Sequence, residues 1–109
     1  MEELIKFFRQ EKIYNENFFE FMNGKIIVVP NTTDIFWYGC FPLVEDGILK
    51  DIRLLVPEIK TGQDLLINIH EFTHALELYQ ELGHVYQARR EEREAKARAM
   101  EKRFLKTKM

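Results

Sequence analysis

The sequence is poor in cysteine, proline and glycine, and it contains no long hydrophobic run. Its 109 residues include one cysteine, Cys40, which excludes a disulfide bond within the chain and favours a reducing compartment. No apolar segment approaches the roughly 20 residues of a membrane-spanning helix. The chain starts with Met1-Glu2-Glu3, which is acidic and unlike a signal peptide. We therefore expect a cytoplasmic protein without a membrane partner.

The chain also lacks an excess of charge of one sign. Its formal net charge is −2 although 31% of the residues are charged, so the composition gives no reason to expect nucleic acid as a partner. Hydrophobic residues make up 46% of the chain, which is enough for a packed core in one small domain. We expect a single domain over residues 1–109.

The first half of the chain changes from a helical to a strand-like pattern. Apolar residues recur at helical spacing in residues 2–22, and Asn23 and Gly24 end that predicted helix, since both tolerate positive φ angles. Turn residues then separate three stretches that are rich in β-branched and aromatic residues. These stretches predict a three-stranded antiparallel sheet over residues 25–29, 35–41 and 48–56.

Two helices are predicted in the second half. Thr61 and Asp64 have the spacing of a capping box, with an acid in the usual place of Glu or Gln. The helix that follows, over residues 64–82, is apolar around most of its circumference, which is typical of a buried central helix. Gly83 ends it, and a charged helix extends from about residue 85 to residue 108. The predicted fold class is therefore α+β.

The central helix carries the pattern His-Glu-x-x-His at residues 70–74. His70 and His74 are four residues apart and share one helix face, so both imidazoles can reach the same metal ion. Glu71 lies beside that face, where it can take a proton from a water molecule on the metal. Two histidines and a glutamate in an otherwise apolar helix are costly unless a ligand or partner satisfies them. The pattern predicts a zinc site with its own general base.

Two histidines leave such a site one protein ligand short, because catalytic zinc usually has three protein ligands and one water. His84 is the only other histidine in the chain. It follows Gly83 at the expected end of the helix, where a turn residue is the more common role. The better candidates are the glutamates of the last helix: Glu91, Glu92 and Glu94.

Helical geometry chooses among these glutamates. A stripe of small residues indicates the face that approaches the central helix, and it consists of Ala88, Ala95 and Ala99. Glu92 lies in that stripe, whereas Glu94 points away from it at about 100° per residue and can pair with Arg98. We predict Glu92 as the third ligand, with Glu91 and Glu94 as alternates.

The 70–74 motif, followed about twenty residues later by a helix with a ligand glutamate, resembles the gluzincin peptidases. Several branches of that group carry the ligand as Glu-x-x-Ala, which residues 92–95 match and residues 94–97 match less directly. The element order resembles the minimal members of the group, the minigluzincins. The resemblance covers residues 64 to about 99. It implies one Zn²⁺ ion held by His70, His74 and Glu92, and it implies Glu71 as the catalytic base.

The sequence lacks one feature of that family. Many gluzincins have an aspartate four residues after the ligand glutamate, where it supports a ligand histidine. That position is Lys96 here, or Arg98 if Glu94 is the ligand, so the support must come from elsewhere in the chain. No motif fixes the residue that stabilises the oxyanion, for which the candidates are His84, Tyr86 and Tyr79.

The resemblance implies a peptide or protein substrate that extends along an edge strand of the sheet. Residues 48–56 are one candidate for that strand, although we favour an ordinary sheet strand there.

The charged tail, residues 101–109, can cover the cleft or form a solvated helix end, and we favour the second. Cys40 is interpreted as a small buried hydrophobic residue and not as a thiol that blocks the metal.

Three functions are compatible with these residues. The first is a zinc-dependent metallopeptidase of the endopeptidase type, whose activity can be weak, selective or latent. The second is a non-catalytic protein in which zinc stabilises a binding or regulatory module. The third is a helical interaction protein in which the motif is accidental. The family resemblance favours the first.

Overall fold

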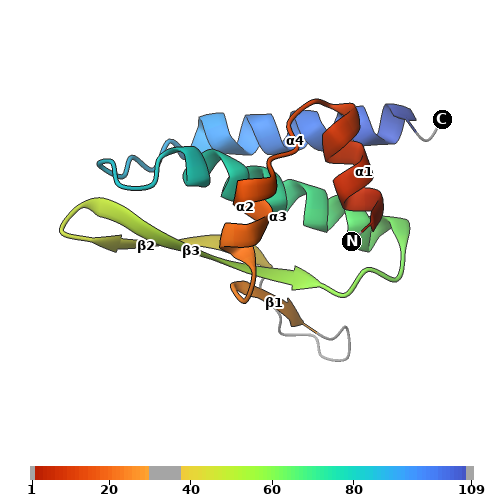
Figure 1. Cartoon of the computed structure of the whole chain (residues 1–109). Coiled ribbons are helices and arrows are strands. Elements are labelled where there is room, and N and C mark those ends of the chain that lie inside the picture. The colour runs from red at the N-terminus through yellow and green to blue at the C-terminus, as the bar shows by residue number, and fades with distance from the viewer. Residues whose placement is uncertain (1, 30–37, 108–109) are drawn as a thin grey trace.

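The computed structural model describes residues 2–29 and 38–107, and it has the predicted α+β fold. Helix α3 lies between the sheet on one side and helices α4 and α1 on the other (Figure 1). The elements in chain order are α1 (Glu2–Gln10), α2 (Glu16–Met22), β1 (Ile26–Val29), β2 (Gly39–Glu45), β3 (Ile48–Pro57), α3 (Gly62–Gln80) and α4 (Arg90–Thr107).

The N-terminal segment forms two helices, so the prediction of one helix over residues 2–22 is wrong. Lys12 adopts a positive φ of 60°, which ends the first helical segment. Asn15 then caps α2, because its side chain accepts a hydrogen bond from the Phe18 amide at 3.2 Å. The apolar spacing is nevertheless real, since Leu4 and Phe8 in α1 and Phe18 in α2 are fully buried.

The three strands form a mixed sheet in the order β1-β3-β2. A two-residue turn joins β2 to β3, in which Asp46 and Gly47 both have positive φ, as an antiparallel hairpin favours. Strand β1 is parallel to β3, so the prediction of a purely antiparallel sheet is wrong. A short β-branched run carries no signal of its strand direction. The first part of the predicted strand 35–41 lies outside the described residues.

Helix α3 is the centre of the molecule, as its apolar sequence predicts. The Thr61 hydroxyl accepts a hydrogen bond from the Asp64 amide at 3.2 Å, and the Asp64 carboxylate accepts one from the Thr61 amide at 3.0 Å. This capping box is the predicted one, and the helix begins at Gly62. Buried Ile69 and Phe72 are in the same core as the inward side chains of β3, namely Ile52, Leu54 and Val56.

The loop after α3 determines where α4 begins. Its backbone pairs with the β2–β3 hairpin: the Gly83 amide donates to the Leu49 carbonyl at 2.9 Å, and the Tyr86 amide donates to the Gly47 carbonyl at 2.9 Å. Residues 85–89 therefore form no helix, and α4 starts at Arg90, five residues later than predicted. The same pairing holds α4 in a fixed register against α3.

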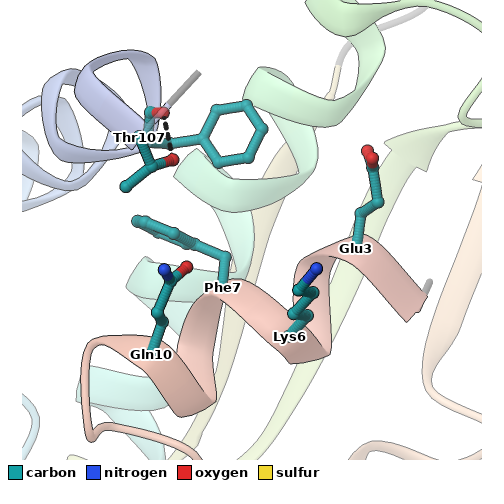
Figure 2. A pocket seen from close by; sticks show the side chains of 6 residues that line it. Glu3, Lys6, Phe7, Gln10 and Thr107 are labelled. Atoms are coloured by element: carbon teal, nitrogen blue, oxygen red, sulfur yellow. Dashed lines mark hydrogen bonds between the residues drawn. The ribbon is translucent and has the colours of Figure 1, made fainter. Parts of the chain in front are cut away.

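The C-terminal end of α4 packs against α1, on the side of the molecule shown in Figure 2. The rings of Phe104 and Phe7 meet edge to face with centroids 5.2 Å apart. A small pocket of about 180 Å³ lies beside them, bordered by Lys6 and Thr107 (Figure 2). Residues 101–107 form the helix end that the sequence favoured, but this end is packed against α1 through buried Phe104 and is not the solvated end that was predicted.

None of the helices in the described part of the chain has the length and apolar character that crossing a membrane requires.

Candidate metal centre

Helix α3 brings three potential metal-binding side chains together. His70 and His74 are one turn apart, and their Nε2 atoms are 3.2 Å from each other. Glu71 completes a group whose candidate ligand atoms all lie within 4.8 Å of one another. The helix that carries them is capped at Thr61 and packed into the core, so the predicted convergence of these side chains is present on a rigid element.

Helix α4 contributes Glu94 to the same point. Glu94 Oε1 is 2.8 Å from His70 Nε2, and Glu94 Oε2 is 3.1 Å from His74 Nε2. Glu92 is exposed on α4, so its predicted approach to the central helix is wrong. Glu91, the other alternate, is exposed too. The geometry thus favours Glu94 as the acidic partner of the histidines.

The error at Glu92 came from the choice of helix face. Ala88 precedes α4, and Ala95 and Ala99 are exposed on it. The buried face consists of Arg93, Ala97, Met100 and Phe104. At about 100° per residue, Glu92 is about 140° from Ala97, whereas Glu94 is only about 60° from it.

Arg93 is the reason why the sequence did not indicate the buried face of α4. Its guanidinium is buried, yet it contacts the Glu81 carboxylate at 2.6 Å and donates to the carbonyls of Gln87 and Ala88 at 2.9 Å each. A second carboxylate, that of Glu77, lies 3.6 Å away. A charged residue that is satisfied at a helix interface has the same sequence signature as a solvated one.

The spacing of the donor atoms fits a small tetrahedral metal ion. With zinc–nitrogen and zinc–oxygen bonds of about 2.0–2.1 Å, neighbouring donors in a tetrahedral site are roughly 3.3 Å apart. The three contacts among His70, His74 and Glu94 measure 2.8, 3.1 and 3.2 Å. Two imidazole nitrogens and a carboxylate are also the donor set that zinc accepts in catalytic sites.

Glu71 is the most perturbed acid near this point. Its side chain is only 7% exposed, and burial raises its pKa from an ordinary 4.5 to about 7. His70 opposes this shift, while the negative charges of Glu94 and Glu101 add to it. A carboxyl group with a pKa near neutrality is suited to both accepting and returning a proton.

The pKa shifts of His74 and Glu94 favour the protonation states of metal ligands. Burial lowers the pKa of His74, with a further contribution from His70, which favours the neutral imidazole. Burial would raise the pKa of Glu94, but the charges and hydrogen bonds of the two histidines outweigh it and lower the pKa. A neutral imidazole and an ionised carboxylate are the forms that bind metal.

These groups face an open cleft of about 900 Å³ between β2, α3 and α4. Residues 38–42 form one wall, and the other is formed by α4 with Arg90, Glu94, Arg98 and Glu101. Among the described residues, β2 pairs with a strand on one side only, while β3 is the central strand. The edge strand beside the cleft is therefore β2, and residues 48–56 are the ordinary strand that the sequence favoured.

The candidates for oxyanion stabilisation lie in different surroundings. His84 is exposed on the loop after α3, where its backbone pairs with Leu49. Tyr79 packs in an aromatic cluster, with ring centroids 5.5 Å from Phe18 and 5.3 Å from Phe21. Tyr86 lines the cleft and remains a candidate.

Cys40 also lines the cleft, on β2. Burial, together with the nearby Glu71 carboxylate, raises the pKa of its thiol to about 12. The side chain is therefore a neutral thiol at physiological pH and not a metal-blocking thiolate, but it is half-buried at the edge of the core and not fully buried as predicted.

One residue of the site was not identified from the sequence. Glu101 Oε2 lies 3.2 Å from Nδ1 of His70, on the side of the ring away from Glu94. It is seven residues after Glu94, which places both side chains on the same flank of α4. That spacing was the available signal, but it becomes informative only when Glu94 has been identified as the acidic partner.

No protein-family model matches the chain, and the searches of the curated proteins and of the solved structures gave no match either. The described residues do contain a His70-Glu71-His74 group that could hold a metal ion. The membership in the gluzincins that the motif suggests stays a prediction.

Proposed function

We propose that this protein is a zinc-dependent peptidase of gluzincin type, with one Zn²⁺ ion held by His70, His74 and Glu94. The observation that carries the proposal is the convergence of these three side chains beside a buried glutamate at the floor of an open cleft. A merely structural metal site would have no need of the cleft or of the perturbed Glu71 carboxyl group.

The zinc ion, Glu71 and Tyr86 each have a defined task in this proposal. Zinc at this site would act as a Lewis acid, which makes water a stronger nucleophile at neutral pH. Glu71 accepts a proton from the attacking water on its carboxylate and can return it to the leaving amine, since its pKa is about 7. Tyr86 borders the cleft, where its hydroxyl group can stabilise negative charge on the substrate carbonyl.

The walls of the cleft suggest how a peptide would bind. Among the described residues, β2 has a strand partner on one side only, and the backbone groups of its other side could pair with an extended peptide as a further strand. Phe41 is 45% exposed at this wall, and it offers an apolar surface. Arg90 and Arg98 lie one turn before and one turn after Glu94 on the opposite wall, and both are exposed. We therefore expect a preference for peptides with acidic side chains near the cleaved bond.

A second function is favoured by one observation. Glu94 of α4 contacts both histidines of α3, so a metal ion bound by all three would fasten the two helices together. This arrangement suits a zinc-stabilised binding or regulatory module as well as an enzyme. The two proposals differ in what Glu71 does, because only the enzyme needs it as a base.

Hydrolysis of a mixed peptide library by the zinc-loaded chain, read by mass spectrometry, separates these functions. We expect cleavage by the native chain, and we expect Glu71→Gln to keep its zinc but to lose roughly 100-fold or more of the rate. Glu92→Gln is the matched control, since it removes the same charge at an exposed position of α4. Equal cleavage by the native chain and Glu71→Gln would refute the enzymatic proposal, and zinc binding without any cleavage would favour the module.

A further inference from the structure

The Nδ1 atom of His70 has a carboxylate partner, and what we infer from this contact rests on the proposed function. Its Nε2 atom faces Glu94 and His74, at 2.8 and 3.2 Å. Its Nδ1 atom faces the Glu101 carboxylate at 3.2 Å. The ring is therefore held from both sides by groups of α4, one at the metal centre and one behind it.

We propose that Glu101 is the positioning residue of the metal centre, which fixes the orientation and the tautomer of His70. A neutral imidazole carries one proton, on either Nδ1 or Nε2, and an ionised carboxylate can only accept a hydrogen bond. With the proton on Nδ1, the ring donates to Glu101 and turns the Nε2 lone pair toward the metal. With the proton on Nε2, the Nδ1 lone pair faces a negative oxygen and the metal-binding lone pair is lost.

The position of Glu101 compensates for the missing aspartate. The residue four after Glu94 is Arg98, a cation that has no acceptor to offer His70. Glu101 is seven residues after Glu94, which is almost two full turns, so at about 100° per residue the two side chains differ by only about 20° around the helix. A single helix thus supplies both the acidic ligand and the support behind the histidine.

Two other carboxylates, on α3 and at its C-terminal end, are engaged in ion pairs with residues of α4. Glu77 contacts Lys96 at 3.3 Å and Arg93 at 3.6 Å, and Glu81 contacts Arg93 at 2.6 Å. Glu101 is 28% exposed and contacts His70 directly. It is the acid of α4 whose geometry suits the Nδ1 side of the ring.

The direct test reads the tautomer of His70 by ¹⁵N NMR at pH 8 in metal-free Glu94→Ala protein, because the Glu94 carboxylate, 2.8 Å from Nε2, would otherwise compete for the ring proton. We expect the Nδ1–H tautomer in Glu94→Ala, and we expect the added Glu101→Ala change to shift His70 toward the Nε2–H tautomer. Glu92→Ala is the matched control, which should leave the His70 signals unchanged. His70 in the Nε2–H form in Glu94→Ala, or identical His70 signals with and without the added Glu101→Ala change, would overturn the inference.

The second readout is zinc affinity, measured by competition with a chelating dye. Removal of a carboxylate behind a ligand histidine typically weakens metal binding 10- to 100-fold, so we expect a loss of about that size in Glu101→Ala. Glu101→Gln keeps an acceptor oxygen and should lose less. Circular dichroism shows whether each variant is folded.

The two readouts distinguish this inference from the proposed function. If the chain binds zinc and Glu101→Ala binds it equally well, Glu101 has no positioning role while the zinc site stands. If the chain binds no zinc at all, the proposed function fails, and the tautomer of the metal-free His70 still decides the role of Glu101.

Discussion

The buried Glu71 carboxyl group should make the stability of the metal-free protein depend on pH, and Glu71→Gln should remove that dependence. Glutamine has nearly the same shape but no ionisable group, so the variant isolates the effect of the charge. Glu71 is only 7% exposed, and its pKa in the folded chain is about 7 against an ordinary value of 4.5, with burial as the main cause.

The direction follows from which state binds more protons. Between pH 4.5 and 7 the folded protein keeps a proton on Glu71 that the unfolded chain has lost, so the free energy of unfolding falls as the pH rises through this window. A shift from 4.5 to about 7 corresponds to about 3 kcal/mol, most of which develops between pH 5 and pH 8. Glu71→Gln should therefore be more stable than the native chain, and more so at pH 8.

Urea unfolding in the presence of a metal chelator, at pH 5 and at pH 8, measures this difference. Glu92→Gln controls for the loss of one negative charge, because Glu92 is exposed on the neighbouring helix. A gain in Glu71→Gln that has the same size at both pH values would refute the reasoning, because it would mean that ionisation of Glu71 does not oppose folding.

Two further predictions concern the contacts that hold the site in place. Arg93→Met should lower the free energy of unfolding by about 2–4 kcal/mol in urea, because it leaves the Glu81 carboxylate and two carbonyl groups without their buried donor; a loss below about 0.5 kcal/mol would contradict this. Thr61→Ala should cost about 1 kcal/mol by removing the cap of α3, while Thr61→Ser should retain most of the stability. Equal losses in both Thr61 variants would mean that the hydroxyl group is not the stabilising element.

The parts of the site that lie on one helix could be predicted from the sequence. The spacing of His70 and His74 is a property of any α-helix, and the apolar residues around them identified a central helix. The capping box of Thr61 and Asp64 is equally local. Nothing outside residues 61–80 was needed to bring these groups together.

The register between two helices could not be predicted in the same way. It depends on where α4 starts, and that start is set by pairing of the preceding loop with the hairpin at Gly47 and Leu49. It also depends on the buried Arg93, which the sequence alone does not distinguish from a solvated residue. Because of both features, Glu94 and not the expected Glu92 contacts the two histidines, and Glu101 lies behind His70.

The direction of β1 was unpredictable for a similar reason. Residues 26–29 have a β-branched pattern that suits either a parallel or an antiparallel neighbour. In the part of the chain that the structure describes, the strand order β1-β3-β2 leaves β2, not β3, at the edge beside the cleft, which is where the proposed function needs a peptide to bind.

Zinc binding by the native chain and by the variants Glu94→Gln and Glu92→Gln tests the central claim most directly. Atomic absorption gives the stoichiometry, and dye competition gives the affinity. The account predicts one zinc ion per chain, unchanged affinity in Glu92→Gln, and a loss of more than about 100-fold in Glu94→Gln, because loss of a ligand should exceed the loss of its support. Absence of zinc binding by the native chain, or equal affinities in the two variants, would contradict it.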